Sequence, residues 1–422
     1  MQFEQSLIVA GVAGLVDGTN RMQSEPQVSV VRQIPRSVWV LGWVSLFMDI
    51  SSEIIHSLLP MFLLTVLGAS AGAIGLIEGI AEATAPIVKV FSGTLSDYLG
   101  NRKWLAVAGY SLGAVSKPLF AIAPTLGIVV MARIMDRVGK GIRGAPRDAL
   151  VADVTPQHLR GAAFGLRQAL DTVGAFLGPL AAVLIMQLGA DNFRLAFWFA
   201  VIPGLLAVGL LTFGVKEPVH ERQAKGINPV RWASLRDLDL KYWWVVGIGA
   251  VFSLARFSEA FLVLRAMGSG VPIALVPLVM VTMNVVYAAS AYPFGKLADT
   301  MSHTRLLVAG LIVLIGSDIV LAHGTHWSIV LAGVALWGLH MGMTQGLLAT
   351  MVAHTAPPHL RGSGFGFFNL LSGIVTLASS VIAGQLWERL GAATTFYAGA
   401  AFSVVTVALL LFYPTPAAGD TR

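Results

Sequence analysis

The chain has 422 residues, of which 56% are apolar and 12% are charged, and its formal net charge is +6. Soluble domains carry about 25% charged residues, so this composition excludes an ordinary soluble protein and places the chain in a membrane. The absence of cysteine excludes thiol chemistry and disulfides. The positive net charge does not indicate a nucleic-acid partner, because most loop lysines and arginines lie on one side of the membrane, as a membrane topology requires.

Apolar stretches recur along the whole chain, each long enough to cross a bilayer core of about 30 Å at about 1.5 Å per residue. We therefore predict an all-α membrane protein with twelve transmembrane helices. The predicted spans are 37–66, 71–96, 104–123, 126–152, 162–187, 195–214, 242–265, 271–297, 305–323, 327–352, 362–387 and 392–413.

Lysine and arginine are distributed unevenly between the two sides of these spans. With the N-terminus inside, the outer loops hold only Arg194, Arg265 and Arg389, and the other loop lysines and arginines face the cytoplasm. The positive-inside rule then places both termini in the cytoplasm. We expect a multi-pass protein of the bacterial inner membrane.

Two pairs of segments about 201 residues apart are alike, which indicates two copies of one unit. The segment Pro156-Gln-His158-Leu159-Arg160-Gly161-x-x-Phe164-Gly165 recurs as Pro357-Pro-His359-Leu360-Arg361-Gly362-x-x-Phe365-Gly366. The segment Gly93-Thr-Leu-Ser-Asp97 is echoed by Gly295-Lys-Leu-Ala-Asp299. Because each copy holds an even number of spans, the copies are parallel repeats. In chain order we predict a cytoplasmic tail at 1–36, a six-helix bundle at 37–214, a cytoplasmic linker at 215–241, a second six-helix bundle at 242–413 and a cytoplasmic tail at 414–422.

The strongest motif lies between spans two and three and consists of Gly93, Asp97, Gly100 and Arg102. The glycines permit a tight turn, and Asp97 can accept hydrogen bonds from helix N-terminal amides or an arginine. With six plus six spans and a central linker, this pattern resembles the major facilitator superfamily. The resemblance covers nearly the whole chain after residue 36. It implies alternating access by rocking of the two halves, with this loop as a gating element that latches the outward-facing state.

Span five carries Gly165, Gly174, Gly178 and Pro179, which resemble the span-five motif of the drug:proton antiporters in that superfamily. The final glycine pair of that motif is replaced here by Ala182-Val183. The resemblance implies export. The alternative is plain helix packing, because small residues let helices approach closely and proline can kink a span.

Ionisable residues lie inside the apolar spans of the first half, where each would cost about 2.5–3.5 kcal/mol if it faced lipid. Their helical spacing instead turns them toward a shared interior, with acids and bases at matching depths. We predict a cavity charge network that, besides the residues named next, contains Glu78, Glu82, Asp136, Lys140, Arg167 and Asp171.

Within this network Asp49 and Glu53 are the predicted proton carriers, with Arg133 and Arg137 as their partners. A carboxylate held by a movable arginine can load and release a proton when its burial and pairing change. Arg133 also resembles the span-four arginine of the superfamily, which implies assistance in proton transfer. The alternative is a purely structural role, which we favour for the charged residues near the cytoplasmic face.

The second half is poorer in charge and richer in aromatic and amide side chains. We predict that part of the substrate surface is formed by Asn284, Tyr287, Trp337, His340 and Asn369. Core packing is the competing interpretation for each aromatic residue.

Phosphate-binding loops, zinc-type spacings and nucleophile–base pairs do not occur in the sequence. We therefore expect no enzyme, no cofactor, no metal site and no use of ATP. The predicted function is proton-coupled secondary transport of a small organic molecule by a monomer, with export by antiport. The alternatives are proton symport or facilitated uptake of an organic anion (a metabolite or siderophore), and a membrane sensor without transport.

Overall fold

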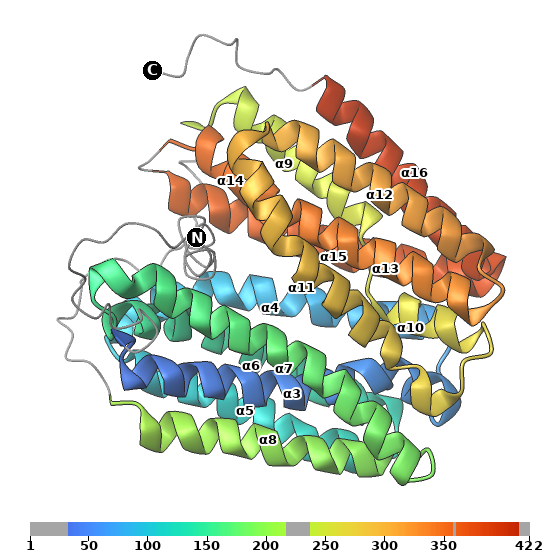
Figure 1. Ribbon diagram of the computed structural model, residues 1–422, viewed down its shortest axis with the longest axis horizontal. Helices are drawn as coiled ribbons and strands as arrows, with labels where there is room; N and C mark the ends of the chain where they lie inside the picture. Colours follow the sequence, from blue (N-terminus) through green and yellow to red (C-terminus); the bar gives the residue numbers. More distant parts are fainter. Residues whose placement is uncertain (1–32, 217–236, 358–359, 413–422) are drawn as a thin grey trace, which may run out of the picture.

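The computed structural model describes residues 33–216, 237–357 and 360–412, whose regular elements are all helices joined by turns and short loops, with no strand among them (Figure 1). In the first half the helices are α3 (Arg36–Thr65), α4 (Ala71–Leu99), α5 (Arg102–Ile122), α6 (Leu126–Asp153), the 3-10 turn η1 (Gln157–Leu159), α7 (Arg160–Leu188) and α8 (Phe193–Gly214). In the second half they are α9 (Leu240–Ala255), α10 (Ala260–Met267), the 3-10 turn η3 (Ile273–Leu275), α11 (Leu278–Thr300), α12 (His303–His323), α13 (Trp327–Thr344), α14 (Leu347–Thr355), α15 (Arg361–Leu390) and α16 (Ala392–Leu411).

Some predicted features fall outside these ranges. The tail 414–422 and most of the tail 1–36 and of the linker 215–241 lie outside the described residues, as does His359 of the repeated segment. The side chain of Asp97 is likewise not among those described.

The helices confirm an all-α membrane protein. Within the described ranges, eleven crossings are long and apolar enough to span a membrane. The remaining predicted span corresponds to α6, which has 28 residues but carries many charged side chains. Its charges point into the protein, so its low mean hydropathy is compatible with a transmembrane position.

The repeat seen in the sequence reappears in the helix starts. Helices α12, α13 and α15 begin about 201 residues after α5, α6 and α7, respectively. Figure 1 shows α3 to α8 gathered on one side and α9 and α11 to α16 on the other.

Two crossings in the second half are each built from two helices. Span seven is interrupted between α9 and α10 at Arg256–Glu259, and span ten between α13 and α14 at Gln345–Gly346. Gly346 has φ 74°, a left-handed conformation that glycine adopts at no steric cost. The helix can be interrupted at the first of these positions because the polar residues there line a cavity rather than lipid.

Glycines let α5 and α6 approach each other closely. A Cβ on Gly139 would lie 2.6 Å from the carbonyl oxygen of Gly109, and a Cβ on Gly109 would lie 2.8 Å from that of Gly139. The backbones are therefore in direct contact. This contact fixes the rotation of α6 and so directs its charged stripe inward.

We expect Gly139→Val to prevent this contact and to abolish most of the folded protein. The added carbon atoms would meet backbone rather than a flexible side chain, and overpacking of this kind costs about 1–3 kcal/mol or more. Gly127→Val is the matched control, because nothing lies within 4 Å of a Cβ on that glycine of the same helix. The yield of monodisperse protein in detergent measures the effect, and equal yields for the two variants would contradict this account.

The two halves meet along α4 and α15, which lie side by side (Figure 1). A Cβ on Gly384 would lie 2.8 Å from the Ala71 carbonyl oxygen and 3.2 Å from Gly75 Cα. At the end of this contact, Glu388 accepts hydrogen bonds from the Ser70 hydroxyl at 2.7 Å and the Gly72 amide at 2.9 Å. We call this contact between the start of α4 and the end of α15 the outer contact, because the predicted topology places it outside.

Candidate functional site

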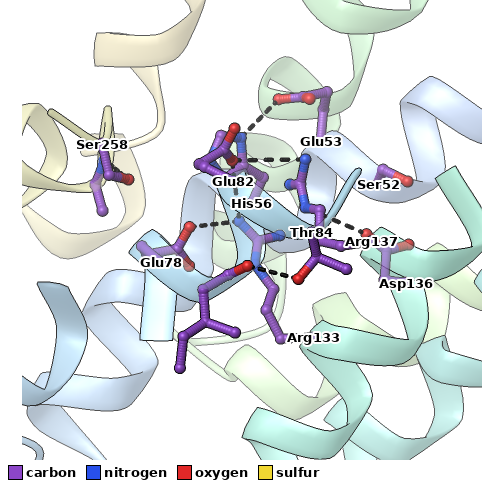
Figure 2. A network of polar contacts seen from close by, with 12 residues as sticks. Ser52, Glu53, His56, Glu78, Glu82, Thr84, Arg133, Asp136, Arg137 and Ser258 are labelled. Carbon is purple, nitrogen blue, oxygen red and sulfur yellow. Dashed lines mark hydrogen bonds and ion pairs between the residues drawn. The ribbon is translucent and has the colours of Figure 1, made fainter. Parts of the chain in front are cut away.

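Two arginines of α6 face two glutamates of α4 (Figure 2). Arg133 Nη2 lies 2.5 Å from Glu78 Oε2, and Arg137 Nη1 lies 3.5 Å from Glu82 Oε1. Arg133 also approaches Glu82, at 4.0 Å. Both pairs are spaced by four residues, so each helix presents its two charges one turn apart on one face. The Arg133–Glu78 pair is almost completely buried, with side-chain exposures of 2% and 0%.

A second buried pair was missed by the sequence reasoning. Lys117 of α5 donates to Asp136 Oδ1 at 2.7 Å and to the Ser52 hydroxyl at 3.1 Å. Asp136 also lies 3.8 Å from Arg137 Nε. The sequence carries a signal for this pair, because Lys117 lies inside the predicted span 104–123 and an intramembrane lysine implies a buried acidic partner.

Asp49 and Glu53 lie where α3 packs against α7. A Cβ on Gly174 would lie 3.0 Å from Asp49 Cβ, and a Cβ on Gly178 would lie 2.5 Å from Glu53 Cβ. The two glycines of the span-five motif therefore touch the two predicted proton carriers. Pro179 lies inside α7 beside this contact.

The predicted pairing of these carboxylates with Arg133 and Arg137 is not formed in this conformation. Both arginines are engaged by α4, and Glu53 lies instead 3.4 Å from His56 Nδ1, one turn further along α3. The reason is geometric, because α4 presents Glu78 and Glu82 directly to the arginine face of α6.

Arg167 and Asp171 belong to a separate cluster toward the predicted cytoplasmic end. Asp171 lies 3.7 Å from Arg147 and 4.0 Å from Arg167. Asp148 lies 3.8 Å from Arg167 and 3.7 Å from Lys89. The predicted single network is therefore divided into two clusters, one around Arg133 and one around Asp148.

A cavity of about 320 Å³ opens between the two halves and is bounded by charged, polar and aromatic side chains. It is lined by Glu53, His56, Glu82, Arg137, Lys140, Phe252, Ser253, Arg256, Phe257, Ser258, Glu259, Trp337 and Thr376. Charges of both signs come from both halves, because the interruption of span seven places Arg256 and Glu259 on the cavity wall.

Three of the charged cavity residues form no ion pair within the described part of the chain: Lys140, Arg256 and Glu259. Arg256 instead places its guanidinium 5.6 Å from the Phe252 ring centre. Unpaired charges of both signs facing one cavity can bind a ligand that carries complementary charges.

The predicted substrate residues of the second half are not brought together. Trp337 lines the cavity, whereas His340 is buried with its Nδ1 2.8 Å from the Gly310 carbonyl oxygen. Asn284 donates to the carbonyl of Ala175 in the first half at 3.1 Å. Tyr287 is half-buried, and Asn369 is exposed and does not line the cavity.

The predicted gating loop is a helix–turn–helix connection. Gly100 ends α4 with φ 61°, and a Cβ on Gly93 would lie 3.4 Å from Ala145 Cβ of α6. Arg102 forms an ion pair with Asp153 at the end of α6. The loop is thereby tied to α6 on the predicted cytoplasmic side. Gly165, the first residue of the span-five motif, is buried in the adjacent α7.

His56, Glu78 and Glu82 place ligand-type atoms within 4.8 Å of one another, a spacing that a metal ion could use. The two carboxylates are, however, already paired with Arg133 and Arg137. Two neighbouring guanidinium groups disfavour a divalent cation electrostatically. We therefore do not assign a metal site to these residues.

Comparison with known proteins identifies the family. The sequence profile of the Major Facilitator Superfamily matches residues 41–375 and, in a second match, 248–422. The chain belongs to the major facilitator superfamily. Members of this superfamily are transporters rather than enzymes, so the protein is a secondary transporter.

The chain is similar to individual members of the superfamily over different shares of its length. It is 31% identical over 393 residues to the uncharacterized MFS-type transporter MJ1317 of Methanocaldococcus jannaschii, covering 90% of this chain and 96% of the relative. It is 26% identical over 183 residues, 43% of this chain and 46% of the relative, to the quinolone resistance protein NorA of Staphylococcus aureus. A crystal structure of the nucleoside transporter NupG superposes with a TM-score of 0.77 at 12% identity, covering 90% of this chain and all of that one. The last similarity concerns the fold alone.

Proposed function

We propose that this transporter couples the movement of a small, charged organic molecule to protons, and that it exports this molecule by antiport. The observation that carries the proposal is the cavity between the halves, where the carboxylates of Glu53 and Glu82 and three unpaired charged groups face one space. Intramembrane ionisable groups usually mark a substrate or proton pathway.

Asp49 and Glu53 are the proposed proton carriers. Glu53 lines the cavity beside His56, so a proton that it binds or releases can exchange with the cavity. Asp49 lies one turn away at the same contact with α7. Because the Cβ atoms of Asp49 and Glu53 pack on the glycines of α7, a shift of that helix would change the surroundings of both side chains and so their affinity for protons.

Two features support export. The span-five glycines, which resemble those of the drug:proton antiporters, pack on the proposed carriers. The similarity to a quinolone resistance protein covers less than half of the chain and points in the same direction. We further propose a monomer in the bacterial inner membrane with both termini in the cytoplasm, as the distribution of lysine and arginine supports.

A second candidate is proton-linked uptake of an organic anion. It is favoured by Lys140 and Arg256, the two unpaired cations that face the cavity from opposite halves. An anionic substrate could bridge them by charge-assisted hydrogen bonds.

Flux in proteoliposomes under an imposed pH gradient tests these proposals. The probes are norfloxacin, a quinolone with both an amine and a carboxylate, and benzoate, a simple organic anion. A gradient of about two pH units supplies about 2.7 kcal/mol per proton, enough for an approximately hundredfold concentration ratio. We expect opposed movement of protons and norfloxacin, and loss of this coupling in Asp49→Asn and Glu53→Gln.

Asp191→Asn is the matched control, because Asp191 is exposed in a loop with φ 60°, a conformation that asparagine tolerates. Movement of benzoate in the same direction as protons would favour the uptake candidate. If the flux of both probes is independent of the pH gradient, in the wild type and in the two variants alike, proton coupling is overturned.

A further inference from the structure

A carboxyl group in the second half is buried without any partner. Asp318 of α12 has an exposure of 0%, and neither of its carboxylate oxygens has a hydrogen-bond partner within the described residues. The buried carboxylates of Glu78 and Asp136, by contrast, face Arg133 and Lys117. The surroundings of Asp318 therefore differ in kind from those of the charge network in the first half.

The helices packed against α12 offer nothing that would neutralise a negative charge. Within the described chain α12 packs mainly against α13, α16 and α14. The titratable groups of these three helices are His340, whose Nδ1 is 2.8 Å from the Gly310 carbonyl, Tyr397, whose hydroxyl is 3.1 Å from His323, and His354, whose ring lies against His303. Arg265 of α10 also reaches α12, where its guanidinium donates to the carbonyls of Leu321, Ala322 and Gly324. None of them pairs with Asp318. An isolated carboxylate in such a site is too costly to persist, so Asp318 carries its proton in this conformation.

One aromatic ring separates Asp318 from the cavity. A Cβ on Gly399 of α16 would lie 2.8 Å from Asp318 Oδ2 and 3.0 Å from Phe257 Cε1, so the carboxyl and the ring are neighbours at the same point. Phe257 is also part of the cavity wall, and its ring centre lies 5.4 Å from that of Trp337. Phe257 thus covers Asp318 from the cavity side.

The covering ring lies in the interruption between α9 and α10, which is attached to α15. The Ser258 amide donates to the Ser380 hydroxyl at 3.2 Å, and the Ser379 hydroxyl donates to the Leu254 carbonyl at 2.9 Å. Ser380 is itself part of the outer contact, since a Cβ on Gly79 of α4 would lie 3.1 Å from Ser380 Cβ. A separation of α4 from α15 would therefore pull on the segment that holds Phe257.

We propose that Asp318 is a second proton-binding site of the transport cycle, covered by Phe257 while the outer contact is closed and uncovered when it opens. The inference rests on the proposed proton coupling and adds a proton-binding site in the second half. The chemistry is a simple proton transfer. Water in the cavity accepts the proton of the Asp318 carboxyl group when Phe257 moves aside, which leaves a carboxylate, and returns it before the contact closes.

The chain has no cysteine, so two introduced thiols can carry spin labels without background. Val66→Cys and Arg389→Cys place them at exposed positions near the outer contact, one in each half. Distances are measured by electron–electron resonance on the full chain in lipid nanodiscs at several pH values. We expect the ratio of open to closed populations to rise with pH, by at most about tenfold per pH unit for one proton.

Asp318→Asn keeps the shape of the protonated carboxyl group but cannot ionise, so it should fold. In this variant we expect the ratio to stay near its acidic value at alkaline pH, while Asp191→Asn responds like the wild type. A ratio in Asp318→Asn that follows the wild-type curve overturns the proposal, and so does a wild-type ratio that does not change with pH.

Infrared spectroscopy of the purified protein supplies an independent readout. At neutral pH the wild type should show the C=O band of a protonated carboxyl group that Asp318→Asn lacks. Exchange of this proton for deuterium should be faster in Phe257→Ala, which removes the cover but keeps the carboxyl group. A difference spectrum that contains only carboxylate bands, or an exchange rate that Phe257→Ala leaves unchanged, overturns the proposal.

Norfloxacin flux distinguishes this inference from the proposed function. If flux remains fully driven by the pH gradient in Asp318→Asn but not in Asp49→Asn, the proposed function stands and the role of Asp318 falls. If the gradient drives no flux in the wild type, the proposed function falls irrespective of the result at Asp318.

Discussion

Replacement of Arg133 by glutamine should destabilise the protein by about 3–5 kcal/mol, the cost of removing one partner from a buried ion pair. The Arg133–Glu78 contact of 2.5 Å joins two side chains that are almost completely inaccessible. Without the guanidinium, Glu78 would hold an uncompensated charge or take up a proton, and either change costs free energy. Equilibrium unfolding in mixed micelles measures the difference in the free energy of unfolding.

Two further variants test the cause of this loss. Glu82→Gln should cost about 1 kcal/mol or less, because Glu82 is one-third exposed and its ion pairs are longer, at 3.5 and 4.0 Å. The double variant Arg133→Met/Glu78→Met should recover most of the stability that Arg133→Gln loses, since apolar residues of similar volume replace buried pairs well. Equal losses for Arg133→Gln and Glu82→Gln would show that burial of the pair is not the cause.

Replacement of Gly384 by leucine should shift the transporter toward a conformation in which the outer contact is open. The added side chain would meet the Ala71 carbonyl and the backbone of Gly72, which cannot yield without separating α15 from α4. An overpacking cost of about 1–3 kcal/mol in the closed state would change the ratio of the two states by about 5- to 150-fold. Loss of the hydrogen bonds that Glu388 accepts at the same contact would act in the same direction.

Labelling of Ala71→Cys by a membrane-impermeant maleimide reports this shift, because Ala71 is buried in the closed contact. Labelling should be slow in the otherwise unchanged chain and fast with Gly384→Leu. Gly362→Leu is the control on the same helix, since a Cβ at Gly362 has nothing within 4 Å. A folded Gly384→Leu protein that labels as slowly as this control would mean that the contact does not close the transporter.

Much of the architecture could be read from the sequence because the responsible forces act locally. Each span is recognised by the free energy of transferring about twenty apolar residues into lipid, which depends on composition rather than on neighbours. The helix starts of the second half repeat those of the first because the sequence repeats. The inward direction of the charged stripes also follows from helical periodicity alone, and Arg133 and Glu78 illustrate it.

The choice of partners could not be read in this way. Glu53 lies against His56 rather than an arginine, Asp171 belongs with Arg147 and Arg167, and Lys117 holds Asp136. These pairings depend on how far each helix is rotated and shifted along its neighbour. The backbone contact of Gly109 with Gly139 sets that offset for α5 and α6, and no residue-by-residue pattern reports it.

The sequence by itself determined that this protein crosses the membrane in two similar halves and keeps its ionisable residues away from lipid. Only the tertiary structure decided which charges neutralise each other and which stay unpaired in the cavity, and it alone revealed the partnerless Asp318 behind Phe257. The physical reason is the difference in which residues each effect depends on. Insertion into lipid and helix periodicity are properties of neighbouring residues, whereas the state of a buried charge is decided within a few ångströms by side chains from other helices.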